Sequence, residues 1–456
     1  MINNFTFLLA SIFFVLGLGK IKAQDELEYR RSSLTLVLIE DDFGDSKDMI
    51  VSSYESYPFP DKYNLHQIED KRFIPSSLIL TEDDYKIGGF YLDTLKTFKD
   101  FMVALKKPLN TVRYITADSS MAVLEPNEKE ILQMQIDKYI REKKLAKQIV
   151  STWFNRSSDG QMDWSVIQER GMYSASAEKL DDAKTVALKT DYLMDWDLIG
   201  NTYTIFNKLE FYPNEPVAAL VRETAKSKAI EKFEGKPEVL LNKALEGIEK
   251  VYEKTKEGYT VKCTSFLYQL EWNEEVAEKV KNHLFNNNIS LSDRNVFWDT
   301  TNIFKMNLVG KLTSSSLVTF KIGETRTEEQ IINLQLIRTM DNALAKLQKK
   351  YVQFRPVSPI NSVQPVTARI GLKEGVEPGQ KYEILELVFD KNNNPTYKTV
   401  GKVKVDKKLP IWDNRHGADL DPLLDEEGNI IRTPEFTTFK GGKKAQPGLN
   451  YIRLLK

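Results

Sequence analysis

The chain contains one cysteine, Cys263, and three histidines in 456 residues. A single cysteine excludes an intramolecular disulfide and any zinc site built from cysteine pairs. His66, His283 and His416 are far apart in the sequence, and none lies in an HExxH motif. We expect Cys263 to be a buried, unreactive thiol, because it lies in the apolar run 259–272.

The chain also has almost no net charge: 64 Lys and Arg residues stand against 65 Asp and Glu residues, for a formal net charge of -1. Such a balanced chain has no long-range field to steer nucleic acid or an acidic membrane surface, so nucleic acid is not an expected partner. Hydrophobic content of 41%, with 11% aromatic residues, is enough for packed cores and argues against long disordered stretches. At about 150 residues per domain, the length predicts two to four domains.

Motifs for group-transfer or hydrolytic chemistry are missing. The sequence has no G-x-S-x-G nucleophile elbow and no phosphate-binding P-loop. We therefore expect a non-enzymatic protein with no cofactor and no catalytic residues. The leading rival interpretation is a hydrolase whose working carboxylate pair is dispersed along the sequence.

The N-terminus carries the most informative signal. Residues 5–19 form an apolar run. As a helix this run would span roughly 22 Å, less than the ~30 Å hydrocarbon core of a bilayer. The small Ala23 and the charged segment that follows predict a cleaved secretory signal peptide over residues 1–24. The alternative is an uncleaved interfacial or membrane helix.

The Ala-Gln pair at 23–24 resembles the end of export signals common in Bacteroidota. No cysteine directly follows the apolar run, which argues against an acylated lipoprotein. The resemblance implies an exported protein that is periplasmic, associated with the outer membrane, or extracellular. Other envelope proteins are then the expected partners, and the oligomeric state stays open.

Residues 25–155 are expected to form a mixed α/β domain. The apolar run 33–39 has the length of a strand. Asn127 is followed three residues later by Glu130, which is the pattern of a capping box. This pattern predicts a long helix with a break near 141–144.

Residues 156–354 are expected to form a second α/β domain that ends in a long helix. Strands are predicted at 201–211 and 259–272, with two amphipathic helices between them. A hairpin with its turn at 313–316 is predicted next. A capping box at Thr327 then begins the strongest helix of the chain.

The composition changes at residues 355–365, where three prolines and no helical period predict a linker. Residues 366–456 follow a β pattern, in which Val403 and Val405 alternate with lysines as in a strand with one buried face. The sequence therefore predicts a C-terminal barrel of about five strands. The predicted fold class is α+β and multi-domain, with α/β N-terminal and middle domains before the barrel.

Two segments carry a resemblance to a known family. Residues 371–385 (GLKEGVEPGQKYEIL) and 400–405 (VGKVKV) resemble the C-terminal SH3-like barrel of flagellar assembly protein T. The preceding region, with its long final helix, is similar in order to the curli-secretion-type α/β domain of such proteins. The resemblance does not extend to residues 25–155. It implies a scaffold without a catalytic set and assigns no site residues.

The best candidate site is the acidic loop 412–428. Its residues Asp413, Asp419, Asp421 and Asp425 offer hard oxygen atoms of the kind that Ca²⁺ prefers. Their spacing does not match an EF-hand, and acidic loops are often simply solvated. Two interpretations therefore stand, a plain loop and a cation or partner site.

We expect an exported, non-enzymatic envelope protein that acts as a binding or assembly component. The rival interpretations are the carboxylate-based hydrolase and a carbohydrate- or peptide-binding protein that uses exposed tyrosines and tryptophans. A broad apolar surface patch would favour the assembly role. Two close carboxylates in a cleft, one with a raised pKa, would favour the enzyme. An exposed aromatic platform would favour the carbohydrate or peptide binder.

Overall fold

The structure is a computed structural model that describes residues 32–40, 43–66, 68, 71–92, 113–115, 126–174, 197–256, 258–318, 327–389, 395–418, 425, 429–442, 445–447 and 450–455. The signal peptide predicted at 1–24 lies outside these residues. Within the described ranges, no helix is both long enough and apolar enough to cross a membrane.

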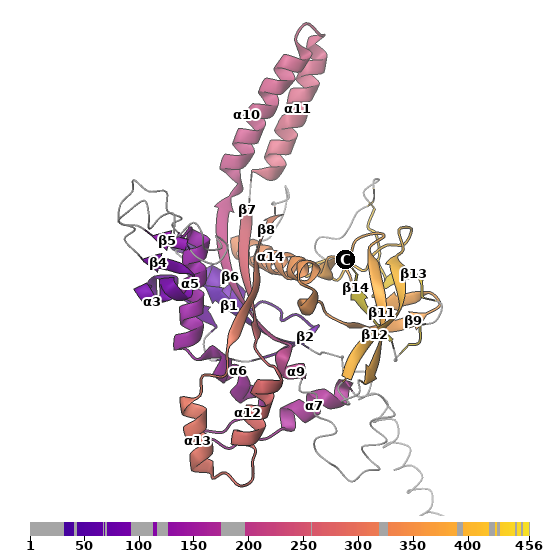
Figure 1. Cartoon of the computed structure of the whole chain (residues 1–456). Coiled ribbons are helices and arrows are strands. Elements are labelled where there is room, and N and C mark those ends of the chain that lie inside the picture. The colour runs from indigo at the N-terminus through magenta and orange to yellow at the C-terminus, as the bar shows by residue number, and fades with distance from the viewer. Residues whose placement is uncertain are drawn as a thin grey trace, which may run out of the picture.

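A mixed sheet forms the centre of the larger domain (Figure 1). Its strands lie in the order β2-β1-β6-β7-β8, and β3 also pairs with β1. β1 is parallel to β2, β3 and β6, whereas β7 is antiparallel to both β6 and β8. The boundary predicted at residue 155 is corrected, because β1 and β6 come from either side of it and share this sheet. The strands are β1 (Ser32–Ile39), β2 (Tyr63–Leu65), β3 (Arg72–Phe73), β6 (Thr202–Pro213), β7 (Tyr259–Leu270) and β8 (Met306–Val318).

The central strands are buried on both faces of the sheet. In β1, Val37 points into one core and Leu38 into another, and both are fully buried. A strand covered on both faces is almost continuously apolar, which is the pattern found at 33–39 and 259–272. Both predicted strands are confirmed, as β1 and β7.

One face of the sheet packs against a single core to which α7 (Ser165–Ser174), α9 (Asp197–Gly200) and four other helices contribute. These four are α5 (Glu128–Glu142), α6 (Leu145–Trp153), α12 (Glu274–Leu284) and α13 (Leu291–Thr300). The capping box at Asn127 is confirmed: its Oδ1 accepts from the Glu130 N–H at 3.1 Å, and the Glu130 carboxylate accepts from the Asn127 N–H at 3.0 Å. The predicted break falls between α5 and α6, where Lys144 has a left-handed backbone with φ of 49°.

The other face packs against α2 (Lys47–Glu55) and α14 (Glu328–Lys350). α14 is the long helix that the sequence predicts. Its capping box is confirmed, because Thr327 Oγ1 accepts from the Gln330 N–H at 3.3 Å and Gln330 Oε1 accepts from the Thr327 N–H at 3.0 Å. Met340 and Leu347 lie on its buried side.

The hairpin predicted with its turn at 313–316 is wrong. β8 runs unbroken through these residues and pairs with the whole length of β7, with Ser314 opposite Cys263. Ser314 is buried, so its small side chain fills a core position. Small polar residues favour a turn locally, but pairing with the 12-residue β7 keeps this segment extended.

Six antiparallel strands close into a barrel at the C-terminus, in the order β10-β13-β12-β11-β14-β9. Val403 and Val405 point into its core and Lys402 is exposed, as predicted. The linker predicted at 355–365 is wrong in part: it contains β9, which pairs with β10 and β14 and raises the strand number to six. The predicted class, α+β and multi-domain with a small C-terminal barrel, is confirmed. The strands are β9 (Ser358–Val363), β10 (Val366–Ala368), β11 (Lys381–Phe389), β12 (Pro395–Val405), β13 (Thr437–Gly441) and β14 (Asn450–Leu454).

Short elements connect these layers. β4 and β5 form a separate parallel pair. The short elements are η1 (Gly44–Ser46), η2 (Pro75–Ser77), α3 (Glu82–Ile87), β4 (Phe90–Leu92), β5 (Arg113–Ile115), α7 (Ser165–Ser174), α9 (Asp197–Gly200), η4 (Val352–Phe354) and η5 (Leu372–Glu374).

A buried carboxylate attaches α3 to α5. Asp84 forms ion pairs with Lys138 at 2.9 Å and with Arg141 at 2.5 Å. It also accepts from the Thr81 N–H at 2.9 Å and from the Thr81 hydroxyl at 2.7 Å. Burial alone would raise the pKa of Asp84, but the hydrogen bonds from Lys138 and Thr81 lower this pKa to about 2.

Asp84→Asn is expected to lower the free energy of unfolding by about 2 to 3 kcal/mol at pH 7, since each pKa unit corresponds to about 1.4 kcal/mol. The folded pKa is the lower one, so this stability is present above about pH 4 and is lost as the pH falls toward 2. Urea titrations of both proteins at pH 7 and pH 3 should show a smaller difference at pH 3. Asp83→Asn, at the exposed neighbouring position, is the control and should change little. An equal loss at both pH values would contradict this account.

Candidate functional site

The structure describes part of the acidic loop that the sequence singled out. Asp413 forms a bidentate ion pair with Arg415, with two N–O distances of 2.8 Å. Asp425 accepts two hydrogen bonds within its own turn. Asp419 and Asp421 lie outside the described residues. Among the residues that are described, no three His, Cys, Asp or Glu side chains come together in a group that could hold a metal ion.

The histidines and the cysteine lie on separate elements. His66 follows β2 and is buried, with Nε2 2.8 Å from the Ile149 carbonyl oxygen, and burial lowers its pKa to about 4. His283 stacks on an aromatic ring of α13, and His416 is exposed in the loop after β12. Cys263 is fully buried, and burial raises its pKa to about 12, so the expected placement of this thiol is confirmed.

Two carboxyl groups with raised pKa values lie where the larger domain meets the barrel. Burial raises the pKa of Asp341 on α14, whose Oδ1 accepts from the Tyr57 hydroxyl at 2.7 Å. Burial likewise raises the pKa of Glu374 in η5, which accepts from the Gly371 N–H at 2.6 Å and from the Asn414 amide at 2.8 Å. Neither group lines the clefts described below. Both carboxyl groups therefore serve packing between elements.

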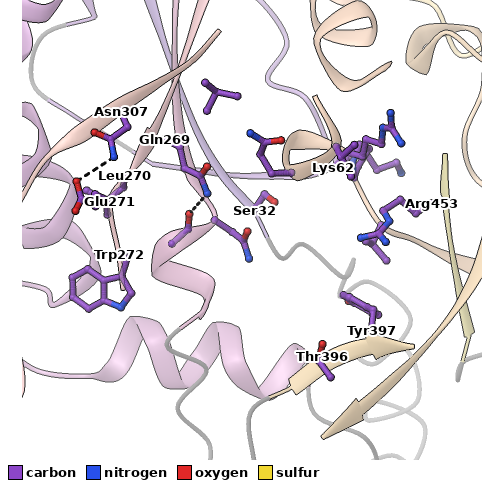
Figure 2. A pocket seen from close by; sticks show the side chains of 18 of the residues that line it. Ser32, Lys62, Gln269, Leu270, Glu271, Trp272, Asn307, Thr396, Tyr397 and Arg453 are labelled. Atoms are coloured by element: carbon purple, nitrogen blue, oxygen red, sulfur yellow. Dashed lines mark hydrogen bonds between the residues drawn. The ribbon is translucent and has the colours of Figure 1, made fainter. Parts of the chain in front are cut away.

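A cleft of about 1000 Å³ opens between one end of the sheet and the barrel (Figure 2). The wall from the sheet carries Gln269 and Trp272 at the end of β7 and Asn307 at the start of β8. The opposite wall carries Tyr397 from β12 and Arg453 from β14. Amides together with aromatic rings are the groups that would bind a saccharide or a peptide.

Internal contacts hold most charged groups of this cleft. Arg453 Nε donates to Glu383 at 2.8 Å. Arg355 donates to three backbone carbonyl oxygens at 2.9 to 3.1 Å, two at the end of α14 and one in β14. Glu271 accepts from Asn307 at 3.1 Å, as the dashed line in Figure 2 shows. The contacts of Arg355 join α14 of the larger domain to β14 of the barrel, so this cleft also lies where the two parts are held together.

The most prominent surface feature is a helical hairpin that projects from the sheet (Figure 1). α10 (Asn214–Phe233) directly follows β6, and α11 (Glu238–Thr255) leads back into β7. Twenty residues of helix span about 30 Å. At its base Pro213 pairs with Tyr259, so the helices continue a β-hairpin. The four hydrophobic cores of the described residues contain no residue of α10 or α11.

One face of this hairpin is apolar and exposed. Val221 on α10 and Val251 on α11 are each 57% exposed, and they border a groove of about 270 Å³ between the helices. Small residues such as Ala225 and Gly247 line the groove and make it shallow. A Cβ added at Gly247 would meet no atom within 4 Å. Further exposed apolar residues lie along the hairpin: Val217, Leu220, Ile230, Val239 and Leu240.

Ion pairs cross between the helices of the hairpin. Glu249 on α11 lies 2.5 Å from Lys226 and 3.8 Å from Arg222 on α10. Arg222 also lies over the ring of Tyr252 at 4.1 Å. These contacts fix the two helices against each other.

The sequence predicted both helices but not their exposure. The sequence of α10 does contain a sign of this exposure. Its packed face carries the small residues Ala218, Ala225 and Ala229. The larger Val217 and Leu220 lie outside that face. A helix that packs only against its own chain normally buries its larger apolar residues. Small apolar residues on the packed face and large ones on the exposed face therefore indicate an apolar surface that the rest of the chain does not cover.

No model of a known protein family matches this chain, and no curated protein sequence matches it. The resemblance to flagellar assembly protein T stays an expectation drawn from residues 371–385 and 400–405.

Proposed function

We propose that this protein is an exported component of the cell envelope that binds another envelope protein through the α10–α11 hairpin. The observation that carries the proposal is the apolar face around Val221, Gly247 and Val251, on an ordered arm that lies outside every described core. Exposed apolar patches on an otherwise folded surface are typical of interaction sites.

The charge of the hairpin narrows the class of partner. Acidic and basic residues nearly balance along 214–256. An arm of this kind gains little from an anionic lipid surface or from nucleic acid. A groove lined by Ala and Gly between two helices instead suits a third helix that presents an apolar stripe. We infer a helical segment of a protein partner.

Export rests on the sequence alone, through the apolar run 5–19 and Ala23. The rival hydrolase hypothesis gains nothing from Asp341 and Glu374, which are held in packing contacts. Asp137, whose pKa is raised by burial, and Asp299 both line a second cleft, so that hypothesis stays a prediction. The rival hypothesis of carbohydrate or peptide binding would use the cleft in Figure 2 and stays a prediction.

A photo-crosslinking amino acid placed at Val221 tests the proposal in intact cells. We expect one major protein adduct, identified by mass spectrometry. The same substitution at Ile79, which is 83% exposed and remote from the hairpin in sequence, should not form that adduct.

A second change tests whether the groove itself makes the contact. Gly247→Lys introduces a long charged side chain where the Cβ has free space, so we expect the protein to stay folded and the Val221 adduct to be lost. Asn242→Lys adds the same charge to another face of α11 and should leave the adduct intact. Equal adducts in all three proteins would overturn the proposed role of this face.

A further inference from the structure

A second cleft lies between the α5–α6 corner and the segment before β8. Its volume is about 570 Å³, within the range of sites that bind small molecules. Ile140, Ala146 and Phe304 line it and are at most 8% exposed. Met306 and Ile87 extend this apolar lining toward the surface. The cleft therefore offers an apolar floor.

Basic residues gather around this floor. Arg141, Lys144, Lys147 and Lys305 all line the cleft. Arg141 is paired with Asp84, and Lys147 Nζ donates to the carbonyl oxygens of residues 298 and 299 at 2.6 and 3.1 Å. Among the described residues, neither Lys144 nor Lys305 forms an ion pair. These two ammonium groups are available to a ligand.

The backbone places Lys144 at the edge of the cleft. This residue has a left-handed conformation with φ of 49°, which is uncommon for a residue other than glycine. It precedes the first turn of α6, in which Ala146 and Lys147 also line the cleft. The N-terminal end of a helix carries a partial positive charge. The same corner holds the C-terminal end of α5, which carries a partial negative charge, so a preference for a negatively charged group comes from the lysine side chains and not from the helix ends.

Two acidic residues also line the cleft and do not cancel this preference. Asp137 accepts from the Tyr268 hydroxyl at 2.7 Å, and burial raises its pKa despite the opposing effects of this hydrogen bond and of Arg141. Asp299 is exposed, and its backbone carbonyl oxygen accepts a hydrogen bond from Lys147 Nζ. With Arg141 paired to Asp84, three lysines remain against two acidic residues in the lining, over a floor that is apolar.

We propose that this cleft binds a single-chain amphiphile with an anionic headgroup, such as a medium-chain fatty-acid carboxylate or an alkyl phosphate. The alkyl chain lies on Ile140, Ala146 and Phe304, and the headgroup lies between Lys144 and Lys305. An apolar chain alone would leave the two ammonium groups unused. A small inorganic anion would leave the floor unused.

Calorimetry on the full chain with decanoate, below its micelle concentration, tests the proposal. We expect saturable binding of one molecule, and binding of uncharged decanol at least tenfold weaker. Each methylene removed from the chain should weaken binding about threefold to fourfold. Decyl phosphate beside decanoate distinguishes the two headgroups. Equal binding of decanol and decanoate, or no saturable binding of either, would overturn the proposal.

Charge reversal locates the headgroup. Lys144→Glu and Lys305→Glu should each weaken decanoate at least tenfold, whereas Lys143→Glu, at the exposed neighbour that does not line the cleft, should not. Ile87→Asp should weaken decanoate, with Ile79→Asp as the matched exposed control. All these positions are exposed, so the variants should fold. Unchanged affinity in both lysine variants would contradict this assignment.

Discussion

Excision of the α10–α11 hairpin is expected to leave the rest of the protein folded while it abolishes the partner adduct. The variant replaces residues 214–258 with Asn-Gly, the pair preferred in two-residue hairpin turns. Pro213 and Tyr259 already face each other as a cross-strand pair, so β6 and β7 can be joined directly. The hairpin contributes no residue to the described cores. We therefore expect the melting temperature to change by less than about 3 °C, equivalent to about 1 kcal/mol for a domain of this size.

Circular dichroism measures the fold. A crosslinker at Val251 of the intact protein shows the adduct on the hairpin itself. A crosslinker at Tyr212, which remains after excision, is placed in both proteins, and the two adduct yields are compared. Removal of α12, whose Val276, Val280 and Leu284 are buried in a core, is the contrasting deletion and should unfold the protein. An excised protein that melts like the α12 deletion would show that the arm is part of the core. An adduct that persists at Tyr212 with unchanged yield would place the partner elsewhere.

Val403→Asp is expected to unfold the C-terminal barrel, at a cost of about 4 kcal/mol or more. Val403 is 3% exposed and lies among the core residues of the barrel. An aspartate there would bury a charge with no partner. Lys402→Asp changes the neighbouring outward position and places an acid opposite Glu383, which should cost less than about 1 kcal/mol.

Thermal unfolding of fragments gives the measurement and also tests the start of the barrel. A fragment from Ser358 contains β9 and should fold, whereas one from Pro365 lacks the strand that joins β10 to β14. The shorter fragment should therefore be less stable or unfolded. Equal harm from the two substitutions would contradict the strand register. Equal stability of the two fragments would contradict the role of β9.

Local features of the fold followed from the sequence. The capping boxes at Asn127 and Thr327 were predictable because each depends on side chains and N–H groups three residues apart. The strand at 33–39 was predictable because burial on both faces requires a continuous apolar run. The alternation around Val403 likewise reports one buried face.

The candidate site followed from the sequence much less well. The acidic residues were visible, but Asp413 is held by Arg415, a contact that composition does not reveal. The cleft that Lys144 and Lys305 line contains residues from the α5–α6 corner and from the segment before β8. Residues so far apart along the chain share a site only after the sheet and its helices have packed.

The sequence by itself determined the longest helices, the apolar strands, the lack of an intramolecular disulfide and the small barrel, because each depends on neighbouring residues or on composition. Only the tertiary structure decided that β1 joins β6 in one sheet, that β8 passes straight through 313–316, and that β9 belongs to the barrel. It also decided that the apolar face around Val221 stays uncovered. Strand pairing and exposure depend on partners distant in the chain, and no local pattern contains them.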